Sequence, residues 1–260
     1  VSNLGSAAIS AVSLVDAINV LIVQAFYALA AGGTVVCSQY LGCKKEKEAN
    51  EAARQLLFIT FVLSVVIAAI CLAANGPLLR LIFGEVEPQV MKYSRQYFII
   101  SAISCPFIAL YDDGSSIFRA QENSKTPMMI SLCANILNLI LNILFVWGFH
   151  MEVIGSATAT MLSRAFSMIA VLCLLRRPEL IIRLRGYLSI RPIWSQIRRI
   201  LYLGIPSGIE NSMFQFVKLA IQSTVSMMGT AAIAAQGMTN ILENLNGILA
   251  IGIGVGLMTV

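Results

Sequence analysis

Residues 17–43 read AINVLIVQAFYALAAGGTVVCSQYLGC and contain no Asp, Glu, Lys or Arg. A helix that crosses a bilayer needs about 20 consecutive, mostly apolar residues, so this stretch is long enough to span a membrane. Three further runs also lack these four residue types, at 55–79, 126–151 and 219–242. No compact soluble core needs several such runs. The sequence therefore predicts an all-α membrane protein, a polytopic bundle of transmembrane helices.

The overall composition agrees with this prediction. Charged residues make up only 12% of the chain, which is about half the fraction found in soluble domains. The formal net charge of +5 would suit nucleic-acid binding if the basic residues formed a patch on a soluble face. They lie instead in short links between the apolar runs, so no nucleic-acid partner is expected. The six cysteines are scattered without a CxxC pair, so neither a metal site nor a cofactor is expected.

The basic links also predict the topology. We expect seven helical segments, at about 7–41, 52–83, 89–120, 125–149, 152–176, 193–227 and from 231 onward. Alternate links carry four, two and seven basic residues, together 13 of the 18 in the chain, at 43–54, 119–125 and 176–199. Because basic links stay on the cytoplasmic side, we predict that these three links face the cytoplasm. The first segment then has its amino end outside, and at least one helix is expected to precede Val1.

An internal repeat predicts two lobes. Residues 4–11 read LGSAAISA and residues 228–235 read MGTAAIAA. An even number of helices separates the two copies, so both cross the membrane in the same direction, as in transporters built from parallel repeats. With six helices per lobe, the whole protein would have twelve. Residues 1–192, including a basic cytoplasmic link at 176–192, would form most of the first lobe, and residues 193–260 would begin the second.

Ionisable residues inside the predicted spans are the main functional signal, because charged groups are costly in a bilayer. Five acids at membrane depth outnumber two bases: Asp16, Asp112, Asp113, Glu210 and Glu243 against Arg164 and Lys218. The surplus of negative charge favours a cationic cargo. Lys218 and Glu210 are eight positions apart, which is about 12 Å along a helix, so Lys218 is expected to face an acid on another helix.

Polar residues also follow helical spacing. Five polar residues share one face of the sixth segment: Ser207, Asn211, Gln215, Lys218 and Gln222. The fourth segment carries a similar stripe: Ser131, Asn135, Asn138 and Asn142. Hydrogen bonding between helices is the alternative reading of such stripes. The repeat aligns Asp16 with Asn240 and Asn19 with Glu243, so each half has one acid and one amide, one turn apart. Each acid either is satisfied within its own half or takes part in binding. The candidate substrate- and ion-binding residues are Asp16, Asn19, Glu210, Asn211, Gln215, Lys218, Asn240 and Glu243.

Four segments, in this order, resemble the multidrug and toxin extrusion (MATE) family. They are GGTVVCSQYLG (32–42), FRAQENSKTPMMIS (118–131), GSATATMLSR (155–164) and GIPSGIENSMFQF (204–216). The resemblance covers essentially the whole chain. It implies a two-lobed, twelve-helix exporter that exchanges H⁺ or Na⁺ for small organic cations across the plasma membrane, without a cofactor and, we expect, as a monomer. Many members carry a Glu eight or nine residues after the proline of the seventh helix, where this chain has Phe214 and Gln215.

Two other functions are weighed against the exporter. A lipid-linked oligosaccharide flippase would share the architecture, but its anionic diphosphate cargo would favour several bases in the cavity, and only Arg164 and Lys218 qualify. An intramembrane enzyme is disfavoured, because the single histidine excludes an HExxH zinc site and the adjacent Asp112 and Asp113 cannot form a dyad across two helices. We therefore expect a transporter in contact with the lipid bilayer, not an enzyme.

Overall fold

The computed structural model describes residues 6–83, 88–149, 151–183, 192–226, 239 and 242, and within these ranges it contains helices and links but no strand. The elements are α1 (Ser6–Gly42), α2 (Glu46–Ala73), α3 (Asn75–Phe83), α4 (Pro88–Ala120), α5 (Lys125–Asn142) with its π-helical extension η2 (Ile143–Gly148), α6 (Glu152–Leu174) and α7 (Trp194–Ser226). The predicted all-α fold class is confirmed.

Membrane-length helices are present as predicted. Four stretches are long and apolar enough to cross a membrane: Ile18–Gly42, Glu46–Ala73, Lys125–Gly148 and Val153–Leu174. The helices α4 and α7 are more polar, but each has 33 residues, which corresponds to about 50 Å. Their length is therefore also sufficient to span a bilayer.

The structure has two helices, α2 and α3, where the sequence predicts one segment at 52–83. The predicted bounds of this segment are therefore wrong. Pro77 has no N–H to donate to the carbonyl of Ala73, so the hydrogen-bond pattern of α2 cannot continue across this point. The chain turns at Ala74, and α3 then begins at Asn75. The start of α2 lies six residues before the predicted one. Glu46 and Glu48 in its first turn interact favourably with the positive end of the helix dipole.

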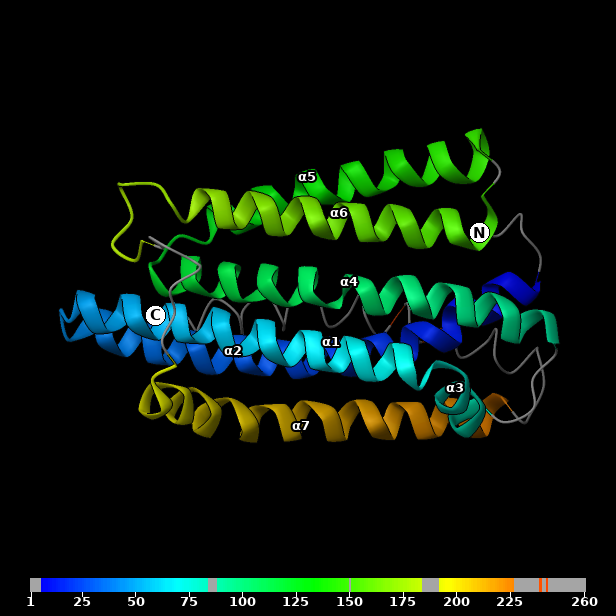
Figure 1. Ribbon diagram of the computed structural model, residues 1–260, viewed down its shortest axis with the longest axis horizontal. Helices are drawn as coiled ribbons and strands as arrows, with labels where there is room; N and C mark the ends of the chain where they lie inside the picture. Colours follow the sequence, from blue (N-terminus) through cyan, green and yellow to red (C-terminus); the bar gives the residue numbers. More distant parts are fainter. Residues whose placement is uncertain are drawn as a thin grey trace. The chain divides into compact units, whose positions relative to one another are not determined.

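The chain divides into two compact units, Val1–Gly208 and Ile209–Val260. In the first unit, α4 is the central helix. It packs against α1 and α2 on one side and against α6 on the other, while α5 packs on α6 (Figure 1). Side chains on α4 are consequently the most enclosed in this unit. The predicted boundary between lobes at 192/193 stays a prediction, and the second copy of the repeat lies outside the described residues.

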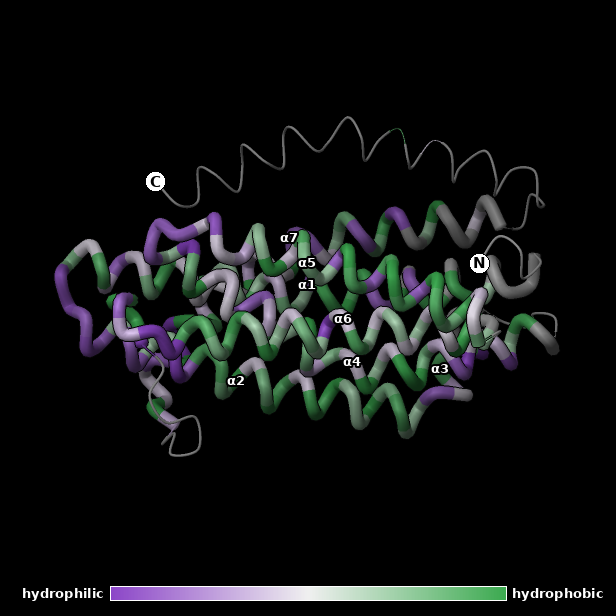
Figure 2. Tube along the Cα trace, turned by 90° about the horizontal axis from the view of Figure 1, so that it is seen from above, coloured by the Kyte–Doolittle hydropathy of each residue, from purple (hydrophilic) through white to green (hydrophobic). Residues whose placement is uncertain are grey.

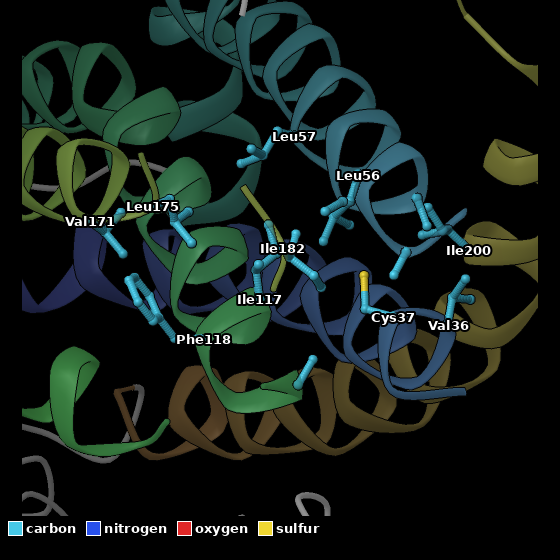
Figure 3. Packing of buried hydrophobic residues seen from close by; sticks show 14 of the residues in the cluster. Val36, Cys37, Leu56, Leu57, Ile117, Phe118, Val171, Leu175, Ile182 and Ile200 are labelled. Carbon is cyan, nitrogen blue, oxygen red and sulfur yellow. The ribbon is translucent and has the colours of Figure 1, made fainter. Parts of the chain in front are cut away.

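A buried apolar cluster closes one end of this unit. Figure 3 shows Ile182, from the link after α6, lying among side chains of other elements such as Leu56 of α2 and Ile117 of α4. Ile182 is fully buried. Figure 2 shows hydrophilic residues gathered at this same end of the bundle. The link therefore contributes Leu175 and Ile182 to the core, while its Arg176, Arg177 and Arg183 are exposed.

Hydrogen bonds hold the same link against α2 and α4. The Asn50 side chain accepts from the Arg183 amide at 2.7 Å and donates to the Ile181 carbonyl at 3.1 Å. The Ile182 amide donates to the Gln121 side chain at 2.9 Å, and the Ile193 amide donates to the Gln55 side chain at 3.2 Å. Both ends of the stretch from 183 to 193 are thus fixed to the first unit.

The first part of α7 lies unusually close to α1. A Cβ atom built on Gly32 would be 2.7 Å from the Ile200 carbonyl oxygen, and one built on Gly204 would be 2.9 Å from that of Ala28. Only glycine fits at these two positions without a shift of the backbone. Arg199 adds polar contacts, since it donates to Gln39 at 2.8 Å and to the Tyr40 hydroxyl at 3.1 Å.

Candidate functional site

Asp16 and Asn19 of α1 lie together with two side chains of α4. The Tyr97 hydroxyl donates to Asp16 Oδ1 at 3.2 Å, and Asn19 Nδ2 reaches the same oxygen at 3.5 Å. Asn19 also donates to the Ser101 hydroxyl at 3.2 Å. We call these four residues the Asp16 cluster. Asp16 is exposed, whereas the other three are buried, so the carboxylate combines fixed hydrogen-bond donors with an open side.

The spacing of three residues between Asp16 and Asn19 explains why they meet, because side chains at i and i+3 share one face of a helix. The structure therefore brings these two candidate residues together, as their spacing indicates. Their role in ion or substrate binding stays a prediction. Tyr97 and Ser101 are not among the candidates from the sequence. They follow i, i+4 spacing on α4, but only the alignment of α1 with α4 shows that they face Asp16.

Arg164 of α6 lies close to this region. Its Nη1 donates to the Ser104 hydroxyl of α4 at 2.7 Å. Its charge also acts on the carboxylates of Asp16 and Asp112. One guanidinium therefore offsets part of the negative charge of these two acids.

A polar pocket of about 270 Å³ lies between α4, α5 and α6. Most of its lining side chains carry hydroxyl or amide groups, and none is acidic: Ile108, Tyr111, Ser131, Ala134, Asn135, Asn138, Thr160, Ser163, Arg164 and Ser167. A water molecule occupies about 30 Å³ of liquid, so the pocket has room for several. Its chemistry suits polar groups that accept from Arg164 or donate to hydroxyl and amide oxygens.

The α5 side of this pocket is the polar stripe that the sequence indicates on the fourth segment. Asn138 donates to the hydroxyls of Ser163 and Thr160 at 3.3 and 3.5 Å, and Asn142 donates to Asn138 Oδ1 at 3.0 Å. Hydrogen bonding between helices and the lining of a pocket thus occur together. The α6 residues that line this pocket are not among the candidates predicted from the sequence. Thr160, Ser163 and Ser167 nevertheless follow the spacing of one helical face.

The candidates on α7 belong to the second unit. Glu210 is exposed, whereas Asn211, Gln215 and Lys218 are half-buried. The Lys218 ammonium lies 5.1 Å from the centre of the Phe214 ring, which is within the range of a cation–π interaction. The expected pairing of Lys218 with an acid on another helix stays a prediction. Asn240 and Glu243 lie outside the described residues.

A second pocket, of about 590 Å³, lies between the start of α2 and the link after α6. Its charged lining residues are Glu46, Lys47, Glu51, Arg54, Glu179 and Arg183. Three acids and three bases balance, so this pocket has no preference for one sign of charge. Among the described residues, no group of three or more His, Cys, Asp and Glu side chains could hold a metal ion.

The sequence of the chain is similar to a family model and to several known proteins. The MatE family model matches residues 1–144. The chain is 28% identical over 260 residues to the probable multidrug resistance protein YoeA of Bacillus subtilis, covering 97% of this chain and 55% of that protein. It is 26% identical to the probable multidrug resistance protein NorM of Thermotoga maritima, covering 97% and 54% respectively. The chain thus spans about half the length of the curated relatives it matches.

The fold has a counterpart among solved structures. An inward-facing multidrug resistance MATE family transporter superposes with a TM-score of 0.85 at 20% identity, covering 96% of this chain and 56% of that one. This likeness concerns the arrangement of helices. It agrees with the expected placement of the chain in a twelve-helix, two-lobed architecture.

Proposed function

The chain belongs to the MatE family, and we propose that it forms about half of a secondary-active multidrug exporter that exchanges small organic cations for H⁺ or Na⁺. The complete protein would act as a monomer in the plasma membrane, without a cofactor and without enzymatic activity. Relatives named as multidrug resistance proteins support the cargo class.

The observation that carries the proposal is the Asp16 cluster. A carboxylate on a helix of membrane length is costly and is typical of ion and substrate pathways. Asp16 is held by Tyr97 and Asn19, yet one side remains open. One carboxylate cannot favourably hold an organic cation and a coupling cation together. Binding of H⁺ or Na⁺ would therefore release the cargo and shift the population between inward- and outward-open states.

The test is ion-driven efflux by the full-length protein in proteoliposomes with an imposed pH or Na⁺ gradient. Asp16→Asn keeps the shape of the side chain but removes its charge, so we expect loss of gradient-dependent efflux of a cationic dye. Glu179→Gln, a charge change in the exposed link, is the matched control and should keep the wild-type rate. Unchanged efflux in Asp16→Asn, Glu210→Gln and Glu243→Gln alike would exclude these acids as the coupling site.

A lipid-linked oligosaccharide flippase is the second candidate. Arg164 favours it, because this base lines a polar pocket that has no acidic lining residue and a guanidinium binds phosphate well. The same proteoliposomes distinguish the two functions. Gradient-dependent dye efflux that a lipid diphosphate does not inhibit supports the exporter, whereas scrambling of a labelled lipid diphosphate without dye efflux supports the flippase.

A further inference from the structure

Asp113 is an acid that the proposed exchange mechanism does not use. It lies on α4, the central helix of the first unit, and its side chain has no exposed surface. Within the described part of the chain, neither of its carboxylate oxygens has a hydrogen-bond partner at normal geometry. Its neighbour Asp112 differs, since it is only half-buried. Adjacent residues on a helix point about 100° apart, so only Asp113 faces the interior between α1, α2 and α4.

One uncharged group faces Asp113 from α2. The Thr60 hydroxyl is directed at the carboxylate, is itself fully buried and likewise has no partner at normal hydrogen-bond geometry among the described residues. Two buried groups without partners therefore lie opposite each other. Buried polar groups are nearly always hydrogen-bonded, so this pair requires an explanation.

Among the described residues, no base compensates the Asp113 carboxylate. The titratable groups that act on Asp113 are the Cys37 thiol from α1 and Asp112 on its own helix. The charges of Arg119 and Arg164 act on Asp112 instead. Figure 3 shows Cys37 pointing into an apolar cluster with Leu56 and Ile117. An ionised carboxylate without a counter-ion in such surroundings is so costly that a carboxyl group becomes neutral instead.

We propose that Asp113 is a proton-binding site at the junction of α1, α2 and α4. The carboxyl group holds a proton in the conformation of this structure, and its O–H donates to the Thr60 hydroxyl oxygen. A single proton thereby gives each of the two buried groups a hydrogen-bond partner. A metal cation would fit less well, because Asp113 and Thr60 together offer only three side-chain oxygens. Release of the proton requires water to reach the junction, and thus a separation of the three helices.

The site is separate from the Asp16 cluster, and its test does not depend on transport. Infrared spectra of the purified full-length protein at neutral pH should contain the C=O stretch of a protonated carboxyl group, which shifts in D₂O. Asp113→Asn should remove this band. The matched control is Asp112→Asn, which changes the adjacent acid and should keep it. Thr60→Val should move the band to higher wavenumber, because the hydrogen bond to the carboxyl group is lost.

Each outcome of the infrared measurements either supports or contradicts the proton-binding site. Loss of the band in Asp113→Asn, with its retention in Asp112→Asn, supports the proton site. A band that is absent in the wild type, or unchanged in Asp113→Asn, contradicts it, and so does a band that disappears when Na⁺ is added. If Asp113→Asn fails to yield folded protein, the shift in Thr60→Val is the deciding measurement, since this variant keeps the acid and an isosteric side chain. Failure of dye efflux in the wild type would affect only the proposed function.

Discussion

Asp16 and Asp113 are acids on neighbouring helices with opposite surroundings. Asp16 has an open side and receives two hydrogen-bond donors, whereas Asp113 is enclosed and faces the Thr60 hydroxyl. The two donors favour the ionised carboxylate, and the open side leaves room for the cation that we propose as a ligand. The surroundings of Asp113 favour a neutral group. At this scale the neighbours of a side chain, more than its type, decide its chemistry.

Substitution of Tyr97 tests whether the hydrogen-bond donors around Asp16 contribute to efflux. Tyr97→Phe removes the hydroxyl that donates to Asp16, and a hydrogen bond to a charged group contributes about 1.5–3 kcal/mol. We therefore expect gradient-dependent efflux at limiting dye concentration to fall about ten- to a hundredfold, with little change in thermal stability. Tyr93→Phe on the same helix is the control and should retain the wild-type rate. Equal rates in the two variants would mean that Tyr97 does not position Asp16.

Individual residues of the candidate site were predictable where one helix supplies both partners. The spacing of Asp16 and Asn19 places them on one face, and the same holds for Asn138 and Asn142. Contacts between helices were not predictable, because they depend on register. Nothing in the sequence alone says that Tyr97 faces Asp16 or that Ser104 faces Arg164.

At the scale of elements, the link after α6 behaves as part of the first unit. Ile182→Ala removes a fully buried side chain from the apolar cluster, and such changes cost about 2–5 kcal/mol. The adjacent Ile181, which is half exposed, is the matched control, and Ile181→Ala should cost less than about 1 kcal/mol. Thermal unfolding of the full-length protein in detergent compares the two. Similar melting temperatures would show that Ile182 adds nothing to stability.

The close approach of α1 and α7 gives a second prediction for elements. Gly32→Ala introduces a Cβ at 2.7 Å from a backbone oxygen of α7, and overpacking of this kind costs about 1–3 kcal/mol. Gly42→Ala is the control, because no atom lies within 4 Å of its added Cβ. We expect a lower melting temperature only for Gly32→Ala. A melting temperature equal to that of Gly42→Ala would mean that α7 moves away at no cost.

The bounds of most helices were predictable from the apolar runs, to within a few residues. The break at Ala74 was not, although Pro77 gives a physical signal for it. Charged residues at the start of α2 end the apolar run, so hydropathy predicts a link there, yet Glu46 and Glu48 stabilise the first turn of that helix. Hydropathy locates the membrane-spanning part of a helix and not its full length.

At the scale of the whole molecule, the basic links predict the orientation in the membrane. Lys45 follows α1 and Lys92 lies near the start of α4, and both are exposed. In a background without native cysteines, Lys92→Cys should react with a membrane-impermeant thiol reagent added to intact cells. Lys45→Cys should react only after permeabilisation. Labelling of both positions from the same side would contradict the predicted topology.

The anchoring of the chain at Arg183 and Ile193 has a practical consequence for engineering. Because Arg183 and Ile193 are both hydrogen-bonded to the same unit, extra residues inserted between them lengthen a connection whose two ends stay fixed. Doubling such a length costs about 0.6 kcal/mol in closure entropy. A fluorescent domain or an epitope inserted there should leave the melting temperature of the protein nearly unchanged, which makes the connection between these two anchored residues a suitable place for a reporter.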